Sequence, residues 1–95
     1  MIEIKNITIE GKVYQGIKVD MDPAPLVMIK GEKGFLMCGY LNMEAADKLG
    51  AKAVSTSGIK TFDDLLNKEV SKISQKAREA GIREGMKGSE ALKML

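Results

Sequence analysis

Two uninterrupted apolar runs constrain the fold more than any other feature of the sequence. Residues 26–29 (Leu-Val-Met-Ile) and residues 35–38 (Phe-Leu-Met-Cys) flank a Gly-Glu-Lys-Gly turn at positions 31–34. Strands that are apolar on both faces lie in the centre of a sheet, with both sides covered. The runs therefore predict an interior β-hairpin whose second strand ends at Cys38.

The segment before this hairpin predicts another one. Apolar and polar residues alternate over residues 2–9, and the alternation slips by one position near Asn6, which predicts a bulge. A turn at 10–12 leads to a second strand over 13–19, where Val13, Gln15, Ile17 and Val19 share one face. The opposite, polar face of this hairpin carries Lys5, Lys12 and Lys18, and we expect that face to be solvated.

A strand–helix–strand unit follows the central hairpin. Asn42 is a good N-cap for a helix that has Met43, Ala46 and Leu49 on one face, and residues 53–56 read as the next strand. A connection of about a dozen residues suits a right-handed parallel crossover. If the two strands are parallel, residues 38–40 lie beside residues 56–58 at one edge of the sheet, where ligand crevices form.

The C-terminal third is mostly helical in pattern. Thr61 and Asp64 resemble a capping box at the start of a helix. Residues 69–80 fit either one helix or a short strand at 69–73 followed by a helix capped by Ser74, and a last short helix spans 89–94. The expected fold is an α+β domain over residues 1–95, with a mixed β-sheet from two β-hairpins plus the strand–helix–strand unit, and a helical C-terminus.

Composition restricts the chemistry. The chain has no His and one Cys, which removes the usual neutral-pH base, the commonest transition-metal ligand and any disulfide within the chain. We expect no cofactor and no metal site, although Mg²⁺ on carboxylates stays open. The net charge of +2 comes from interspersed charges, so we expect no nucleic-acid partner. No run approaches the roughly 20 apolar residues of a membrane span, so we expect no membrane partner and a cytoplasmic location.

The candidate ligand-binding residues gather at the predicted edge. Cys38 reads either as a reactive thiol or, more commonly for a free Cys, as an inert core residue. Gly39 would let a ligand approach the backbone or would only relieve packing. Tyr40 would stack on a ligand or form the edge of the core.

A second group of candidates follows the last sheet strand of this unit. Thr56, Ser57, Gly58, Lys60 and Thr61 combine hydroxyls, backbone N–H groups and one ammonium, which suits a small anion. The same residues also read as a plain turn followed by a helix cap.

Asp63 and Asp64, which follow at once, would hold Mg²⁺ or act as acid and base, but acids in a first helical turn are favoured by the helix dipole alone.

Several blocks of the sequence together resemble a known family. These are Lys33-Gly34-Phe35-Leu36-Met37-Cys38-Gly39-Tyr40-Leu41, then Thr56-Ser57-Gly58-Ile59-Lys60-Thr61-Phe62-Asp63-Asp64-Leu65-Leu66, then Gly81-Ile82 with Gly85-Met86-Lys87-Gly88 and Glu90-Ala91-Leu92. They look like the YunC-like family of small prokaryotic proteins, a domain of unknown function, and the resemblance covers the whole chain. Ser57 departs from the family pattern, which often has Thr there. The resemblance implies an α+β fold with a mixed sheet and supplies no reaction or substrate.

Two hypotheses for function follow from these observations. The first is a non-enzymatic cytoplasmic protein that self-associates as a homo-oligomer or binds a partner, because the aliphatic core is thin and strand edges are exposed. The alternative is a small-molecule or anion-binding protein, or an enzyme, with its site around Cys38 and the turn at 56–58. The sequence leaves open whether the protein is an enzyme.

Overall fold

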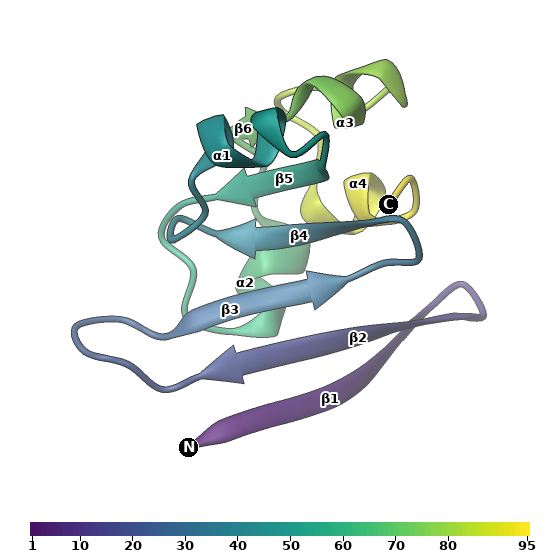
Figure 1. Ribbon diagram of the computed structural model, residues 1–95. Helices are drawn as coiled ribbons and strands as arrows, with labels where there is room; N and C mark the ends of the chain where they lie inside the picture. The colour runs from purple at the N-terminus through teal and green to yellow at the C-terminus, as the bar shows by residue number, and fades with distance from the viewer.

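The computed structural model describes all 95 residues and shows a six-stranded mixed sheet with short helices (Figure 1). The strands are β1 (Ile2–Ile9), β2 (Lys12–Val19), β3 (Leu26–Lys30), β4 (Gly34–Cys38), β5 (Lys52–Thr56) and β6 (Lys72–Ile73). The helices are α1 (Met43–Lys48), α2 (Phe62–Asn67), α3 (Gln75–Glu79) and α4 (Gly88–Leu92). None of the helices has the length and apolar character needed to cross a bilayer. The predicted α+β class is confirmed.

Sheet order follows chain order from β1 to β6, and only β4 and β5 are parallel. The predicted interior hairpin is therefore β3–β4, and the predicted parallel crossover runs from β4 through α1 to β5. In the parallel ladder Cys38 lies opposite Thr56, so residues 38–40 and 56–58 do meet at one edge.

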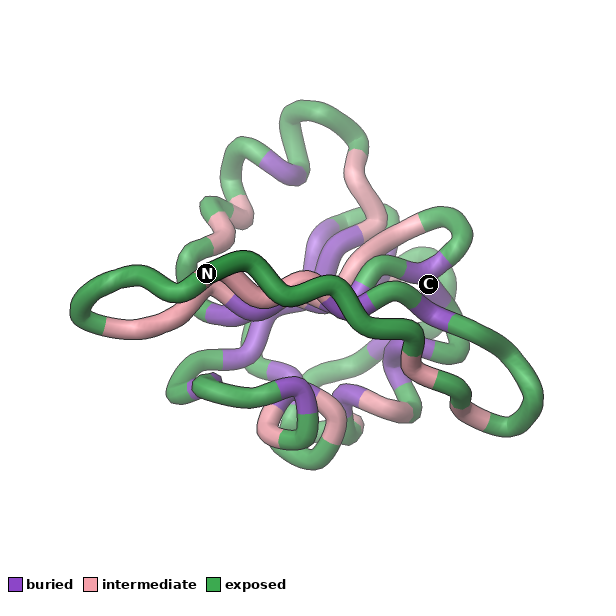
Figure 2. Tube along the Cα trace, turned by 90° about the horizontal axis from the view of Figure 1, so that it is seen from below, coloured by how far each residue is buried: buried purple, intermediate pink, exposed green.

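The two faces of the sheet are covered unequally. Helices α2 and α4 lie behind β3 and β4, whereas α1 lies in front of β5 (Figure 1). Figure 2 shows the sheet edge-on, with most of the remaining chain on one side of it. The Phe62 ring packs so closely on Gly16 that a Cβ there would lie 2.8 Å from it, which places α2 against β2 on the covered face. The buried side chains of β3 and β4, such as Val27, Ile29 and Leu36, belong to this one-sided core.

Four predictions about the first half of the chain are wrong. The β1–β2 register is continuous from Ile2 opposite Val19 to Ile9 opposite Lys12, so there is no bulge near Asn6. The slip in the pattern instead moves the isoleucines from one face to the other, because Ile7 packs on the core while Ile4 is exposed.

The expected solvated face of the same hairpin is also reversed. Tyr14 and Gly16 of β2 are buried on the α2 side, and Val13 on the other side is 60 % exposed. The central strands are accordingly covered on one face rather than two. Leu49, expected on the packed face of α1, is 85 % exposed.

The open question about residues 69–80 is settled by the backbone. Lys72–Ile73 form a short strand beside β5, and Ser74 caps α3 by accepting a hydrogen bond from the Ala77 N–H at 3.2 Å. Ser74 is fully buried and also joins the two elements: its hydroxyl donates to Ala51 O at 2.7 Å and accepts from Ala53 N at 2.9 Å. The strand-then-helix alternative is therefore correct.

Candidate functional site

A cleft of about 250 Å³ lies at the carboxyl ends of β4 and β5. Five of the predicted candidates line it: Cys38, Gly39, Tyr40, Gly58 and Lys60. Three further lining residues were missed from the sequence, Ala24, Pro25 and Ile59. The Asp-Pro-Ala-Pro sequence at 22–25 disfavours regular structure, but nothing in its pattern indicates that this loop folds back over the end of β4.

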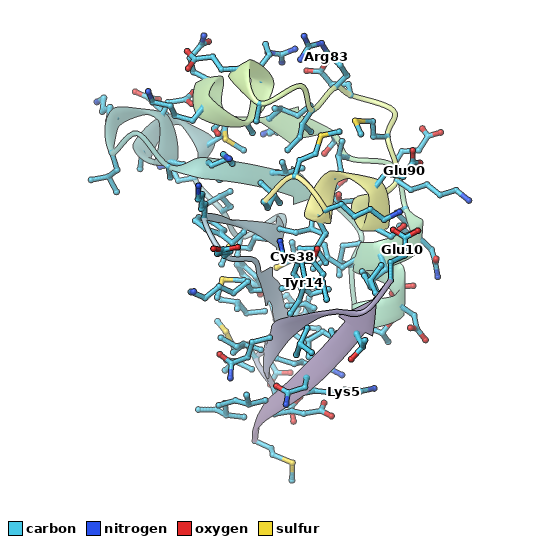
Figure 3. The ribbon with its side chains drawn as sticks, turned by 90° about the vertical axis from the view of Figure 1, so that its right-hand side faces the viewer. Lys5, Glu10, Tyr14, Cys38, Arg83 and Glu90 are labelled. Atoms are coloured by element: carbon cyan, nitrogen blue, oxygen red, sulfur yellow. The ribbon has the colours of Figure 1, made fainter.

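Cys38 forms part of the floor of the cleft. Cys38 is 3 % exposed and belongs to the buried core cluster, in the interior of the molecule (Figure 3). The Val27 N–H donates to the Cys38 sulfur at 3.3 Å, across the β3–β4 pair. The structure thus places the thiol in the core, as the simpler interpretation expects, while leaving it at the bottom of an open cleft.

Tyr40 forms one wall of the cleft and holds a second wall, formed by Ala24 and Pro25, in place. Its ring is half exposed, and its hydroxyl donates to Ala24 O at 2.8 Å. This hydrogen bond joins the end of β4 to the loop before β3, so the wall formed by Ala24 and Pro25 is held in place. Gly39 beside it has open space, because an added Cβ would come no nearer than 3.9 Å to Ser57.

The turn after β5 forms the opposite wall. Gly58 has φ +74°, a conformation that glycine adopts without strain. Its carbonyl accepts a hydrogen bond from the Lys68 ammonium at 2.7 Å. Lys60 also lines the cleft, so two lysines contribute positive charge to this wall.

Thr56 is buried next to Cys38 and has an unusual hydroxyl. Its Oγ1 is the one buried side-chain oxygen or nitrogen in the chain with no hydrogen-bond partner. Thr56 and Cys38 are paired in the parallel ladder, so both side chains point to the same face of the sheet. Buried hydroxyls nearly always have a partner, so this one is an exception within the core beside Cys38, and Thr56 itself does not line the cleft.

The remaining candidates lie elsewhere. Ser57 lines a separate hollow with Ser55, Ser71 and Lys72. Thr61 caps α2 and lines a third hollow beside Glu3 and Lys5. Helices α1 and α2 begin on opposite faces of the sheet, so their N-termini do not open onto one shared pocket.

Asp64 completes the predicted capping box. Its carboxylate accepts from the Lys60 N–H at 3.1 Å and from the Thr61 N–H at 3.3 Å, and the Asp64 N–H donates to Thr61 Oγ1 at 3.0 Å. The hydrogen bond from Lys60 holds the pKa of this carboxyl below its usual value, while partial desolvation opposes the shift. No three His, Cys, Asp or Glu side chains are grouped so as to hold a metal ion.

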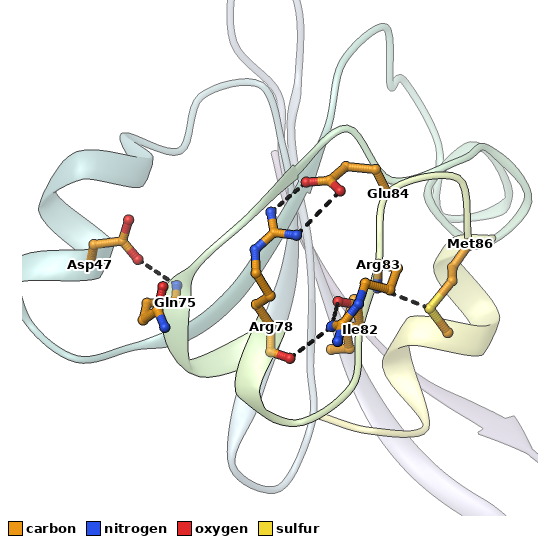
Figure 4. Close-up of polar contacts among 7 residues, drawn as sticks. All are labelled: Asp47, Gln75, Arg78, Ile82, Arg83, Glu84 and Met86. Carbon is orange, nitrogen blue, oxygen red and sulfur yellow. Dashed lines mark hydrogen bonds and ion pairs between the residues drawn. The ribbon is translucent and has the colours of Figure 1, made fainter.

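The basic residues near the C-terminus lie in a network of surface contacts (Figure 4). Arg78 forms an ion pair with Glu84, whose hydrogen bond to the guanidinium lowers the pKa of the Glu84 carboxyl. Arg83 donates to Arg78 O at 2.8 Å, and Asp47 accepts from the Gln75 N–H at 2.8 Å, which joins α1 to α3. These contacts fit the sequence interpretation of a solvated, mixed-charge face.

The fold and the cleft together define a class: a small α+β protein with a one-sided mixed sheet and a crevice at its single parallel strand pair. The chain belongs to the family described as domain of unknown function DUF1805, whose model matches residues 37–95.

Two relatives support this assignment over nearly the full length. The uncharacterized protein YunC of Bacillus subtilis strain 168 is 29 % identical over 96 residues, covering 97 % of this chain and 95 % of that protein. The crystal structure of TA1206, a protein of unknown function from Thermoplasma acidophilum, has 47 % identity and a TM-score of 0.96, covering 100 % of this chain and 93 % of that one. The resemblance seen in the sequence is confirmed, and no specific function is known for the family or these relatives.

Proposed function

We propose that this protein functions as a self-associating protein, in which two copies pack together through the uncovered face of the sheet. We call this surface the open face and define it by the apolar side chains of β1–β4 that point away from α2. They are Ile2, Ile4, Val13, Ile17, Val19, Leu26, Met28, Phe35 and Met37. The observation that carries the proposal is this apolar surface, of which Ile2, Ile4 and Val13 are exposed and the other six side chains half-buried in the single chain.

The sequence pattern itself supports a covering partner. Hydrophobic alternation normally identifies the face of a strand that is buried. In β1 and β2 the more apolar face is the open one, where Ile4 is 63 % exposed and Ile17 is its direct neighbour across the ladder. The face toward α2 instead carries Glu3, Lys5 and Lys18 near the start of that helix.

The size of the open face falls in the range of apolar patches that mark interaction sites. The strands β1 to β4 are spaced by about 4.8 Å and are about 20 Å long, so they span roughly 400 Å² of flat sheet, and projecting side chains add accessible area. Contiguous apolar patches above a few hundred Å² mark interaction sites. A hollow bordered by Met28, Phe35 and Gly34 at one end of this face gives a partner's side chain room to insert.

Charge at the two ends of the open face favours a second copy as the occupant. Lys30 and Lys33 lie at one end of β3, and Asp20 and Asp22 lie in the loop at its other end. A twofold axis running across the strands brings the lysine end of one copy over the aspartate end of the other. A twofold dimer uses the same patch on both subunits, so one apolar face is sufficient to form it.

We place this dimer in the cytoplasm. A single, buried, unpaired Cys38 suits a reducing compartment, where disulfides are rare.

Sedimentation velocity over 1–500 μM tests the proposal. We expect wild type to sediment as a dimer at the upper concentrations, and the double variant Ile4→Lys, Val13→Lys to remain monomeric throughout. Both side chains are already exposed, so the change does not remove core packing. Met94→Lys, which changes a 40 % exposed side chain beyond α4, is the matched control and should leave the dimer intact.

A wild-type monomer over the whole range would overturn the proposal. So would a dimer that the double variant retains, since this would place the interface elsewhere, for example at the free edge of β1. Circular dichroism of each variant confirms that its secondary structure is unchanged.

A further inference from the structure

The cleft at the ends of β4 and β5 holds a group of hydrogen-bond donors that the protein does not use. The backbone N–H groups of Gly39, Tyr40, Gly58 and Ile59 donate to no acceptor in the chain. Gly39, Tyr40 and Gly58 are exposed residues, so water or a bound ligand can accept hydrogen bonds from their N–H groups. The four belong to two segments that line the same cleft, so one bound group with several acceptor oxygens would satisfy more than one of them.

Charge in the cleft favours a negative ligand. Lys60 lines the cleft, is exposed, and has no ion-pair partner. Lys68 lies behind the wall with its ammonium on Gly58 O. Asp64 does not line the cleft, and its ionised carboxylate is turned to the N–H groups of Lys60 and Thr61.

The rest of the lining is apolar and small. Pro25 and Ile59 line the cleft from two separate segments, and Cys38 lies at its floor. A volume of about 250 Å³ equals roughly eight waters at about 30 Å³ each. This is room for a short organic molecule and too little for a nucleotide.

We propose that this cleft binds a small organic monocarboxylate. Its carboxylate accepts hydrogen bonds from the unused N–H groups and pairs with Lys60, and its apolar end lies against Pro25 and Ile59. One free lysine matches one negative charge, which favours a carboxylate over a dianionic phosphate. The proposal is separate from self-association, because it concerns the cleft and not the open face.

A titration followed by ¹H–¹⁵N correlation spectra tests this on the whole chain, with butanoate as the probe and inorganic phosphate and chloride as comparison anions. We expect butanoate to shift the amide resonances of Gly39, Tyr40, Gly58 and Ile59 saturably, with a dissociation constant in the millimolar range, as suits a ligand of about six non-hydrogen atoms. Phosphate should bind at least tenfold more weakly, and chloride should cause no saturable shift.

A matched pair of lysine variants tests the assigned ion pair. Lys60→Met should weaken butanoate at least fivefold, whereas Lys33→Met, at the other end of β4, should have no effect.

The outcomes separate clearly. Saturable butanoate shifts that are confined to these amides and weakened in Lys60→Met but not in Lys33→Met support the proposal. No saturable shift, unchanged affinity in Lys60→Met, or equal loss in Lys60→Met and Lys33→Met overturns it. Binding of phosphate as tight as that of butanoate overturns the choice of a monocarboxylate and identifies a general oxyanion site.

Discussion

The contact between α4 and α2 gives a sharp stability prediction, because it depends on a single missing side chain. Gly88 is the first residue of α4, and a Cβ built there would lie 1.8 Å from the Leu65 carbonyl oxygen of α2 and 3.1 Å from Leu36 Cδ2. Its N–H donates to Lys68 O at 3.0 Å, so the backbone is held at this distance. Gly88→Ala therefore forces α4 away from α2.

The expected cost follows from the displacement. To reach an ordinary contact of about 3.5 Å, the helix must move by roughly 1.5 Å. Overpacking of this kind costs about 1–3 kcal/mol and sometimes more. Leu92 of α4 is fully buried, so the shift also opens a gap around it. Alanine's better helix propensity returns at most about 1 kcal/mol. The net expected loss is about 2–4 kcal/mol, from a total of about 5–15 kcal/mol for a domain of this kind.

Urea unfolding followed by circular dichroism, at one fixed protein concentration, measures this loss. In thermal scans we expect Tm to fall by about 10–25 °C, since 1 kcal/mol corresponds to about 4–8 °C for a chain of this size. Gly39→Ala is the matched control, because its Cβ meets nothing nearer than 3.9 Å, and it should stay within about 0.5 kcal/mol of wild type. A Gly88→Ala variant as stable as the control would refute the reasoning from this close approach.

Three further predictions concern single side chains and assembly. Ser74→Ala leaves the buried Ala53 N–H without an acceptor and should cost about 2–4 kcal/mol in urea unfolding, whereas Ser71→Ala, at an exposed residue, should cost less than half as much. Asp64→Asn should be less stable than wild type at pH 7, and the difference should vanish as pH falls below about 4, because a carboxyl with a lowered folded-state pKa stabilises only while it is ionised; a gap that stayed constant with pH would contradict this. If the open face forms the dimer, each tenfold rise in concentration adds about 1.4 kcal/mol per dimer, so Tm should rise by about 3–5 °C, and a Tm independent of concentration would count against it.

The central architecture could be predicted because the signals there are local. Uninterrupted apolar runs identified β3 and β4 as interior strands, and the short distance from Cys38 to residue 53 required a crossover that brings Cys38 beside Thr56. The helix caps at Asn42, Thr61 and Ser74 could be predicted equally well. In each cap a side-chain oxygen accepts a hydrogen bond from the backbone N–H three residues later in the chain.

The coverage of the sheet could not be predicted in the same way. Which face of β2 is buried depends on where α2 docks, and α2 docks where Gly16 leaves space for Phe62. That fit is a tertiary contact between residues 46 positions apart, so the local alternation of apolar and polar residues cannot predict it. The loop before β3 was missed as a cleft wall for a related reason, because the hydrogen bond from Tyr40 to Ala24 joins segments that are separate in the sequence.

The cleft and the open face are next to each other at the loop of residues 20–25, so the two proposals have a shared consequence. Asp20 and Asp22 lie at the end of the open face that would meet a second copy, and Ala24 and Pro25 form a wall of the cleft. Any shift of this loop on dimer formation also changes the shape of the cleft. Thermodynamic linkage then requires that, if dimerisation strengthens butanoate binding by some factor, butanoate strengthens the dimer by the same factor. A factor of one, measured with wild type and the monomeric double variant, would mean that the Tyr40–Ala24 hydrogen bond holds the wall rigid and that the two surfaces act independently.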